Sequence, residues 1–437
     1  MLGSEESRLA RWQVVTAVAL LAGYSGYYLC RSNLSVAVPA LVADPAAGVD
    51  RAAIGLISSA GIVAYAAGKS ITGVVGDFFG GCALFLGGLF LSVAATLAFS
   101  ASAGLPLFLL WWMVNRFVQS AGWAGLTKTA AHWYPARRYG TVMSLLSLSF
   151  LFGDAAGRYL LGGLLTSGTT WREVFVAAAA ILGVIGAIIA FMLRGSPREV
   201  GLPEPPINAD NIFGHSGGDS SPQSLSDLLR PYFASPSFWL VCGLSFGMTL
   251  IREAFNTWIP VYLSDAHHLA QGTAAQYSAV FPLLGGVSSI AVGVVTDRLR
   301  SGNRVALMIP AMALCTFSLV GLAIATAQQD LTLSLLAIGG TAFCLLGPYT
   351  LLAGAIAMDM GGRKGSATAA GLIDTAGYAG GTLSGFAVGR LAETGGWASV
   401  FNVMAALAAG VGVIAAVYCI EHRRQSAWRA AAQLQSE

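Results

Sequence analysis

Twelve long apolar stretches constrain the fold of this chain more than any other feature of its sequence. An apolar helix needs about 20 residues to cross a bilayer, whereas a spanning β-strand needs only about 10. Only 10% of the 437 residues are charged, against about 25% in soluble proteins. We therefore expect an all-α membrane protein with twelve transmembrane helices, near residues 12–42, 53–76, 82–103, 105–133, 139–168, 171–193, 236–264, 273–296, 303–327, 330–359, 365–392 and 396–421.

A polar segment after the sixth stretch divides the chain into two parts. Residues 194–235 are rich in Gly, Pro, Ser and Asp, a composition typical of a mobile or only locally ordered linker. The expected organisation is a six-helix half over residues 1–193, a linker over 194–235, a second six-helix half over 236–421 and a tail over 422–437.

The positive charges of the loops predict how the chain is oriented in its membrane. Arg and Lys residues gather in the segments on the side of the N-terminus, and the loops on the opposite side hold only Arg51 and Arg172. Because loops rich in Lys and Arg stay in the cytoplasm, we expect the linker and both termini to be cytoplasmic. The short polar N-terminus runs directly into the first apolar stretch, so we expect no cleavable signal peptide.

The two parts of the chain repeat each other at an offset of about 220 residues. The matched pairs, each within an apolar stretch or at its end, are Asp77 with Asp297, Arg31 with Arg252, and Asp154 with Asp374. Repeats related by an axis along the membrane normal place a binding site at the midplane, between the halves. The repeat therefore predicts two pseudo-symmetric halves with a shared central site.

An arginine in the middle of the first apolar stretch marks a candidate binding site. An arginine at a bilayer centre costs about 2.5–3.5 kcal/mol, so Arg31 is expected to face a protein interior. Tyr24 and Tyr28 share its helix face. Arg252 has the matching place in the second half, and two guanidinium forks suit a doubly charged anion. The alternative is a structural ion pair between Arg252 and a carboxylate, although we expect Glu253 to project about 100° away from it.

Other charged side chains within the stretches are weaker candidates. Lys69 either lines the site or neutralises an acid. Asp154 and Arg158 lie one helical turn apart and are expected to neutralise each other, whereas Asp374 has no oppositely charged neighbour on its own helix. We expect Asp374 to gate the site or to balance Arg252 or Lys69, with proton transfer as the alternative.

Aromatic residues and loop acids complete the list of candidates. The aromatic side chains that either line the site or pack between helices are Tyr24, Tyr28, Trp123 and Tyr378. Asp77 and Asp297 end the second and eighth stretches, where we expect them to act as cytoplasmic latches between the halves. Lys128 lies near the end of its stretch, where a lysine side chain can extend towards the membrane surface.

Several classes of function have no support in the sequence. The six cysteines are scattered through or beside the apolar stretches, without the close spacing of a disulfide framework or a metal site. No glycine-rich loop of the kind that holds a nucleotide is present. We therefore expect no cofactor, no metal, no nucleic-acid partner and no enzymatic activity. The expected partners are the lipid bilayer and small molecules, and the protein is expected to be a monomer.

Several motifs in both halves resemble those of one transporter family. The Gly-x-x-x-Asp ends of the second and eighth stretches are similar to the loop signature of the major facilitator superfamily. More narrowly, the segments GYSGYYLCRSNLSVAVPAL, AYAAGKSITGVVGD, IREAFNTWIPVYL and SATAAGLIDTAGYAGG resemble the organophosphate:phosphate antiporter family, which includes glycerol-3-phosphate and hexose-6-phosphate transporters and glucose-6-phosphate translocases. The resemblance implies that Arg31 and Arg252 hold the substrate phosphate, with Lys69 at the position of a family lysine.

The resemblance also implies an activity and a location. The chain is expected to exchange a phosphorylated metabolite, such as a sugar phosphate or glycerol phosphate, for inorganic phosphate across a bacterial plasma (inner) membrane. Arg116 departs from this family and resembles a signature of proton-coupled members of the superfamily. Two alternatives stay open, namely a proton-coupled carrier of carboxylates or other organic anions, and a transporter-like sensor that binds a sugar phosphate.

Overall fold

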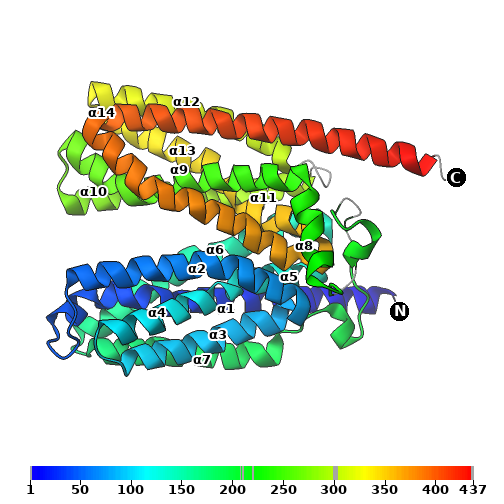
Figure 1. Ribbon diagram of the computed structural model, residues 1–437, viewed down its shortest axis with the longest axis horizontal. Helices are drawn as coiled ribbons and strands as arrows, with labels where there is room; N and C mark the ends of the chain where they lie inside the picture. Colours follow the sequence, from blue (N-terminus) through cyan, green and yellow to red (C-terminus); the bar gives the residue numbers. More distant parts are fainter. Residues whose placement is uncertain (1, 207, 209–210, 219–220, 299–303, 435–437) are drawn as a thin grey trace.

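Long helices from the two halves of the sequence form two bundles that lie side by side (Figure 1). The computed structural model describes residues 2–206, 208, 211–218, 221–298 and 304–434. The first bundle contains α1 (Leu2–Ala43), α2 (Arg51–Phe79), α3 (Gly81–Ser100), α4 (Leu105–Gln119), α5 (Ala121–Trp133), α6 (Tyr139–Thr166) and α7 (Trp171–Met192).

The second bundle ends in a very long helical run. Its elements are α9 (Pro236–His267), α10 (Gln271–Ser278), α11 (Val280–Arg298), α12 (Met308–Gln328), α13 (Leu331–Leu351) and α14 (Ala357–Leu434). The run α14 is interrupted at Gly362 and Gly396, whose φ values of 56° and 73° lie in the left-handed region that glycine tolerates. These two breaks divide α14 into three successive segments.

The helices account for the twelve expected membrane crossings. α4 and α5 form one crossing that is bent at Ser120, and α10 and α11 form another. α13 continues through the π-helical turn Leu352–Ile356 into the first segment of α14. Nine helical runs in the described ranges are by themselves long and apolar enough to cross a membrane, and the last of them, Leu331–Arg424, contains several crossings. The prediction of an all-α membrane protein with twelve helices in two related halves is confirmed.

Helices of the two halves pack against each other at close range. α2 packs against α14, and α6 packs against α11. A β-carbon added to Gly73 of α2 would lie 2.7 Å from the carbonyl oxygen of Ala367, so these two backbones touch. At the second crossing, a β-carbon on Gly140 of α6 would lie 2.7 Å from the carbonyl oxygen of Gly293. Small residues thus let the halves approach closely enough for polar side chains to meet across the interface.

The described part of the linker packs against the bundles instead of standing apart from them. It contains the 3₁₀ turns Pro197–Val200 and Gly214–Gly218 and the helix α8 (Leu225–Ala234). Glu204 forms an ion pair with Arg363 at 2.7 Å, and Asp227 of α8 forms one with Lys364 at 2.8 Å. The hydrogen bond from Lys364, together with one from the Gln223 amide, lowers the pKa of Asp227. For these residues the linker is locally ordered, which is one of the two forms expected from its composition, because their charged groups find partners on α14.

Candidate anion site between the halves

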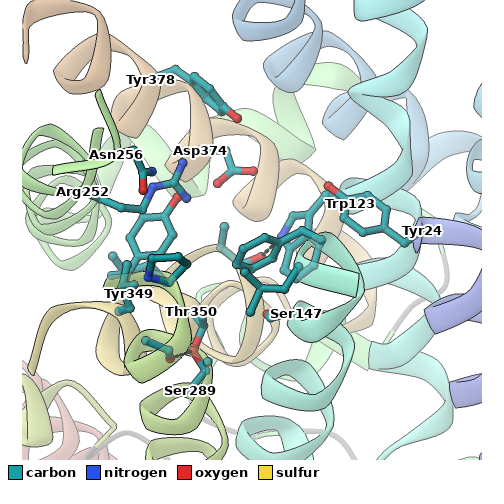
Figure 2. Close-up of a pocket in the computed structure, with 18 of the residues that line it drawn as sticks. Tyr24, Trp123, Ser147, Arg252, Asn256, Ser289, Tyr349, Thr350, Asp374 and Tyr378 are labelled. Atoms are coloured by element: carbon teal, nitrogen blue, oxygen red, sulfur yellow. Dashed lines mark hydrogen bonds between the residues drawn. The ribbon is translucent and has the colours of Figure 1, made fainter. Parts of the chain in front are cut away.

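A cavity of about 250 Å³ lies between the two halves. Its walls come from α1, α2, α5 and α6 of the first half and from α9, α11, α13 and α14 of the second. Figure 2 shows Arg252, Asn256 and Tyr349 on one side of this cavity, and Tyr24 and Trp123 on the other. The candidates from the sequence that line it are Tyr24, Tyr28, Arg31, Lys69, Trp123, Arg252, Asp374 and Tyr378.

Arg31 projects from the middle of α1 into a group of tyrosines. Its Nη1 donates a hydrogen bond to Tyr28 Oη at 2.9 Å, and its guanidinium carbon lies 4.3 Å from the centre of the Tyr65 ring. The negative faces of aromatic rings attract cations at this range. Among the described residues, Arg31 forms no ion pair with a carboxylate, and its buried Nε has no hydrogen-bond partner. Arg31 therefore keeps a charge that is not neutralised and a donor that is not used.

Arg252 reaches the same cavity from α9, but a carboxylate accompanies it. Its guanidinium forms an ion pair with Glu253, in which Nε donates to Oε1 at 3.0 Å. Its guanidinium carbon also lies 4.7 Å from the centre of the Tyr349 ring. The expectation that Glu253 points away from Arg252 is wrong, because helix geometry separates only the Cα–Cβ directions and both long side chains bend back. The ion pair considered as the alternative for Arg252 is present.

Lys69 and Asp374 connect the two halves inside the cavity. Nζ of Lys69 on α2 lies 2.6 Å from Oδ2 of Asp374 on α14, and both side chains are largely buried. Next to this ion pair, the hydroxyl groups of Ser70 and Thr375 lie 2.7 Å apart. Of the two cations that Asp374 was expected to balance, it contacts Lys69 and not Arg252. Removing one member of a buried ion pair leaves the other without compensation, so the two residues form one unit.

Trp123 and Tyr378 also link groups from different helices around the cavity. Trp123 Nε1 donates a hydrogen bond at 2.8 Å to the carbonyl oxygen of Ala353, which lies in the π-helical turn of the opposite half. Such turns occur frequently at functional sites. The Tyr378 ring packs edge-on against the Tyr65 ring, with their centres 5.3 Å apart. Both aromatic candidates therefore line the cavity and also contribute to packing.

Besides the loop acids Asp77 and Asp297, two charged candidates lie outside the lining of this cavity. Asp154 forms the expected ion pair with Arg158 at 2.8 Å, and both side chains are exposed on α6. Arg116 is half-buried behind Tyr65, with its guanidinium carbon 4.7 Å from the centre of that ring. Its Nη1 donates to Gln119 Oε1 at 3.2 Å. Neither residue is in the position of a direct ligand.

Seven polar residues of the cavity were missed in the sequence, namely Tyr65, Ser147, Ser245, Asn256, Ser289, Tyr349 and Thr350. Tyr65 precedes Lys69 by one helical turn and Asn256 follows Arg252 by one turn, so the spacing that linked Tyr28 to Arg31 would have found both. Tyr349 lies in another helix from the arginine that it contacts, and no spacing in the sequence indicates this pairing.

Asp77 joins the halves near the C-terminal end of α2. Its carboxylate accepts a hydrogen bond from the backbone amide of Thr368 at 2.7 Å and a longer one from that of Ala367 at 3.3 Å. Lys128 Nζ forms an ion pair with Asp77 at 2.9 Å. The expectation that Lys128 extends towards the membrane surface is wrong, because this side chain is buried against the acid.

Asp297 makes the corresponding contact from the second half. It accepts hydrogen bonds from the backbone amides of Gly140 at 2.8 Å and Thr141 at 2.7 Å, at the start of α6. Arg304 pairs with Asp297 at 2.9 Å and with Asp359 at 2.7 Å. A carboxylate near the first amides of a helix is stabilised by the helix dipole. Each aspartate thus binds backbone amides of a helix in the other half, and we call these two contacts the latches.

Two six-helix halves around a central cavity form the organisation expected of a membrane transport protein. The sequence profile of the Major Facilitator Superfamily matches residues 20–385, and the chain belongs to this superfamily. The prediction that the protein is a transporter and not an enzyme is confirmed by this membership.

Relatives named for phosphorylated substrates cover most of the chain. The probable hexose phosphate transport protein of Chlamydia pneumoniae is 26% identical, over 91% of this chain and 89% of the relative. The glycerol-3-phosphate transporter of Bacillus subtilis is 26% identical, over 89% of this chain and 88% of the relative. The membrane sensor protein UhpC of Salmonella typhimurium is 24% identical, over 94% of this chain and 92% of the relative. The resemblance to the organophosphate:phosphate antiporter family is therefore confirmed.

A solved structure supports the fold independently of these sequences. The transporter FucP in the outward conformation matches with a TM-score of 0.69 at 14% identity, covering 93% of this chain and 99% of FucP. At this low identity the likeness bears on the fold alone.

Proposed function

We propose that the protein exchanges a phosphorylated metabolite, a sugar phosphate or glycerol phosphate, for inorganic phosphate. The observation that carries this proposal is that Arg31 and Arg252, from opposite halves, line one cavity together with Lys69. Guanidinium groups bind phosphate oxygens through paired, charge-assisted hydrogen bonds, which are stronger in a site of low dielectric constant. The names of the relatives support phosphorylated substrates of this size.

The charges of the cavity suggest how binding is coupled to movement. In the empty site, Arg31 and Arg252 bring like charges to the cavity from opposite halves, so a bound dianion draws the two halves together. A ligand shifts a conformational equilibrium only by its difference in affinity for the two states. The anion binds more tightly to the closed cavity than to the open one, because closure brings cations of both halves to it. An empty cavity has no ligand and therefore gains nothing by closing. Exchange without a nucleotide follows, because only the loaded protein crosses readily between its two open states.

The latches fit this cycle as contacts that form on one side only. With the termini in the cytoplasm, as the positive loops predict, Asp77 and Asp297 close the cytoplasmic side and leave the site to be reached from the opposite side. The cycle to the inward-open state then requires both latches to release. We place the protein in a bacterial plasma membrane, where a monomer suffices because both halves of the site belong to one chain.

Exchange in proteoliposomes tests the proposal. Vesicles that contain the purified protein are loaded with phosphate, and uptake of labelled phosphate is measured with phosphate, hexose 6-phosphates or glycerol 3-phosphate competing outside. Rapid uptake that needs internal phosphate and that organophosphates inhibit is the expected result. Uptake that instead follows a proton gradient, without internal phosphate, would contradict exchange and support the proton-coupled alternative.

A sensor is the second candidate, because the relative UhpC is named as one. A sensor binds a sugar phosphate without moving it through the membrane. Isothermal calorimetry on the detergent-purified protein, carried out beside the exchange assay, separates the two functions. Binding of a hexose phosphate without any exchange would favour the sensor over the antiporter.

A further inference from the structure

Arg116 is a half-buried cation that the proposed phosphate clamp does not use. It lies in the last turn of α4, and no ion pair with a carboxylate is found for it among the described residues. Its one hydrogen bond joins Nη1 to Gln119 Oε1 at 3.2 Å. Holding a half-buried arginine in a membrane protein without a neighbouring carboxylate costs free energy. A bound anion would lower this cost.

The residues around Arg116 hold its guanidinium group in one position. The amide nitrogen of Gln119 is held by the Cys30 carbonyl at 3.0 Å and by Asn115 Oδ1 at 3.0 Å, so its oxygen is turned towards the arginine. Gly61 of α2 supplies the space, because a β-carbon there would lie 3.0 Å from Arg116 Cγ. The amide network and the glycine together hold the guanidinium group against Tyr65.

Three cations surround the ring of Tyr65. The guanidinium carbons of Arg31 and Arg116 lie 4.3 Å and 4.7 Å from the ring centre, and Lys69 Nζ lies 5.0 Å from it. The distance between the two guanidinium carbons therefore cannot exceed the sum of their distances from the ring centre. Like charges at this range repel each other strongly in a medium of low dielectric constant, and a single ring attracts them only weakly.

The balance of charges around the cavity leaves two positive charges over. Asp374 is paired with Lys69, and Glu253 is paired with Arg252. Arg31 and Arg116 remain, on the same side of the site and around one ring. A ligand with two negative charges neutralises both, whereas a ligand with one leaves a positive charge uncompensated.

We infer that Arg116 selects the doubly charged form of the substrate phosphate, acting through Tyr65 and not by touching the ligand. This inference rests on the proposed function, because it concerns the same cavity. Phosphate monoesters and hydrogen phosphate are dianions and satisfy the site, whereas phosphate diesters and monocarboxylates carry a single charge and do not. Arg116 is thus a selectivity residue that sets the charge of the accepted anion.

Two small probes of fixed charge test the inference in the phosphate exchange assay. Monofluorophosphate is a dianion at neutral pH, and dimethyl phosphate is a monoanion of similar size. Inhibition constants of both probes against labelled phosphate are measured for the wild type, Arg116→Gln, Arg116→Lys and the control Arg158→Gln, whose side chain is exposed and away from the cavity. All proteins are compared at one pH and after size-exclusion chromatography.

We expect the wild type to bind the dianion at least tenfold more tightly than the monoanion. Arg116→Gln should lower this ratio by roughly tenfold through weaker binding of the dianion, while Arg116→Lys and Arg158→Gln keep it. An Arg116→Gln protein that exchanges phosphate with the wild-type ratio would overturn the inference. Equal inhibition of the wild type by both probes would do so as well, even if Arg116→Gln does not fold. Absence of exchange in a folded wild type would instead contradict the proposed function itself.

Discussion

Arg31 and Arg252 have matching places in the two halves, but the charges around them differ. Arg252 forms an ion pair with Glu253, its neighbour in the chain. Arg31 is surrounded by the rings of Tyr28 and Tyr65 and has no carboxylate partner among the described residues. The repeat therefore fixes where the two guanidinium groups lie, while the residues around them decide how much charge each presents.

If the protein has the proposed function, this difference predicts different roles for the two halves in binding. The first half supplies the uncompensated charge that attracts an anion, and the second half supplies an arginine whose charge is already shared. A substrate phosphate gains more from Arg31, because Arg252 must divide its donors between the phosphate and Glu253. The site is symmetric in position and asymmetric in strength, which the following substitutions test.

Replacing Arg31 should have the largest effect. Arg31→Ala removes the guanidinium that has no competing acid, and the loss of two charge-assisted hydrogen bonds costs about 3 kcal/mol. This corresponds to a roughly hundredfold fall in the rate of phosphate exchange at low substrate concentration. Initial rates in proteoliposomes measure it, with Arg31→Lys as the matched variant that keeps the charge without the fork. An Arg31→Ala protein that retains a third of the wild-type rate would contradict the asymmetry.

Replacing Arg252 should have a large effect that a second substitution partly repairs. Arg252→Ala removes a cation of the cavity and leaves the neighbouring Glu253 carboxylate without its partner, so exchange should fall roughly thirtyfold. Adding Glu253→Gln removes this unpaired charge and should recover roughly fivefold. The rates of both single variants and of the double variant form a complete cycle. If the double variant is no faster than Arg252→Ala, the ion pair in the empty site has no influence on transport.

The pair Lys69 and Asp374 should show a smaller effect with strong coupling. Lys69→Gln and Asp374→Asn each leave a buried charge without its partner and should slow exchange roughly tenfold. The double variant should be no slower than either single variant, because the members of an ion pair are not additive. Exchange rates and thermal unfolding of all three proteins provide the test. If the double variant is slower by the product of the two single effects, the two residues act separately. Asp374 would then have a role of its own, such as carrying a proton.

Asp154 should have the smallest effect, although it matches Asp374 in the repeat. Its ion pair with Arg158 is exposed, and exposed pairs contribute only about 0–1 kcal/mol. Asp154→Asn should therefore change exchange by less than about twofold. A loss as large as that of Asp374→Asn, measured in the same vesicles, would mean that Asp154 takes part in the transport cycle.

The sequence predicted where the helices and the charged residues of the cavity lie better than it predicted which side chains contact each other. Helix length, the linker and the internal repeat sufficed for the fold, and charges within apolar stretches led to Arg31, Lys69 and Asp374. The contacts between Arg252 and Glu253, and between Asp77 and Lys128, were not predicted. Helix geometry specifies the direction of a side chain at its first bond only, and which distant helix packs against it depends on tertiary structure.

In each latch a carboxylate side chain binds backbone amides, and these two partners differ in how freely their residues can change during evolution. Asp77 and Asp297 bind main-chain amides, which every residue except proline carries. The exposed side chain of Thr141 is therefore free to vary without loss of the contact, whereas the two acids are not. A family that diverges around such a contact would keep its carboxylates and also Gly140, because a β-carbon there would lie 2.7 Å from Asp297 Oδ1. The contact would survive sequence drift at Thr141, whose side chain takes no part in it.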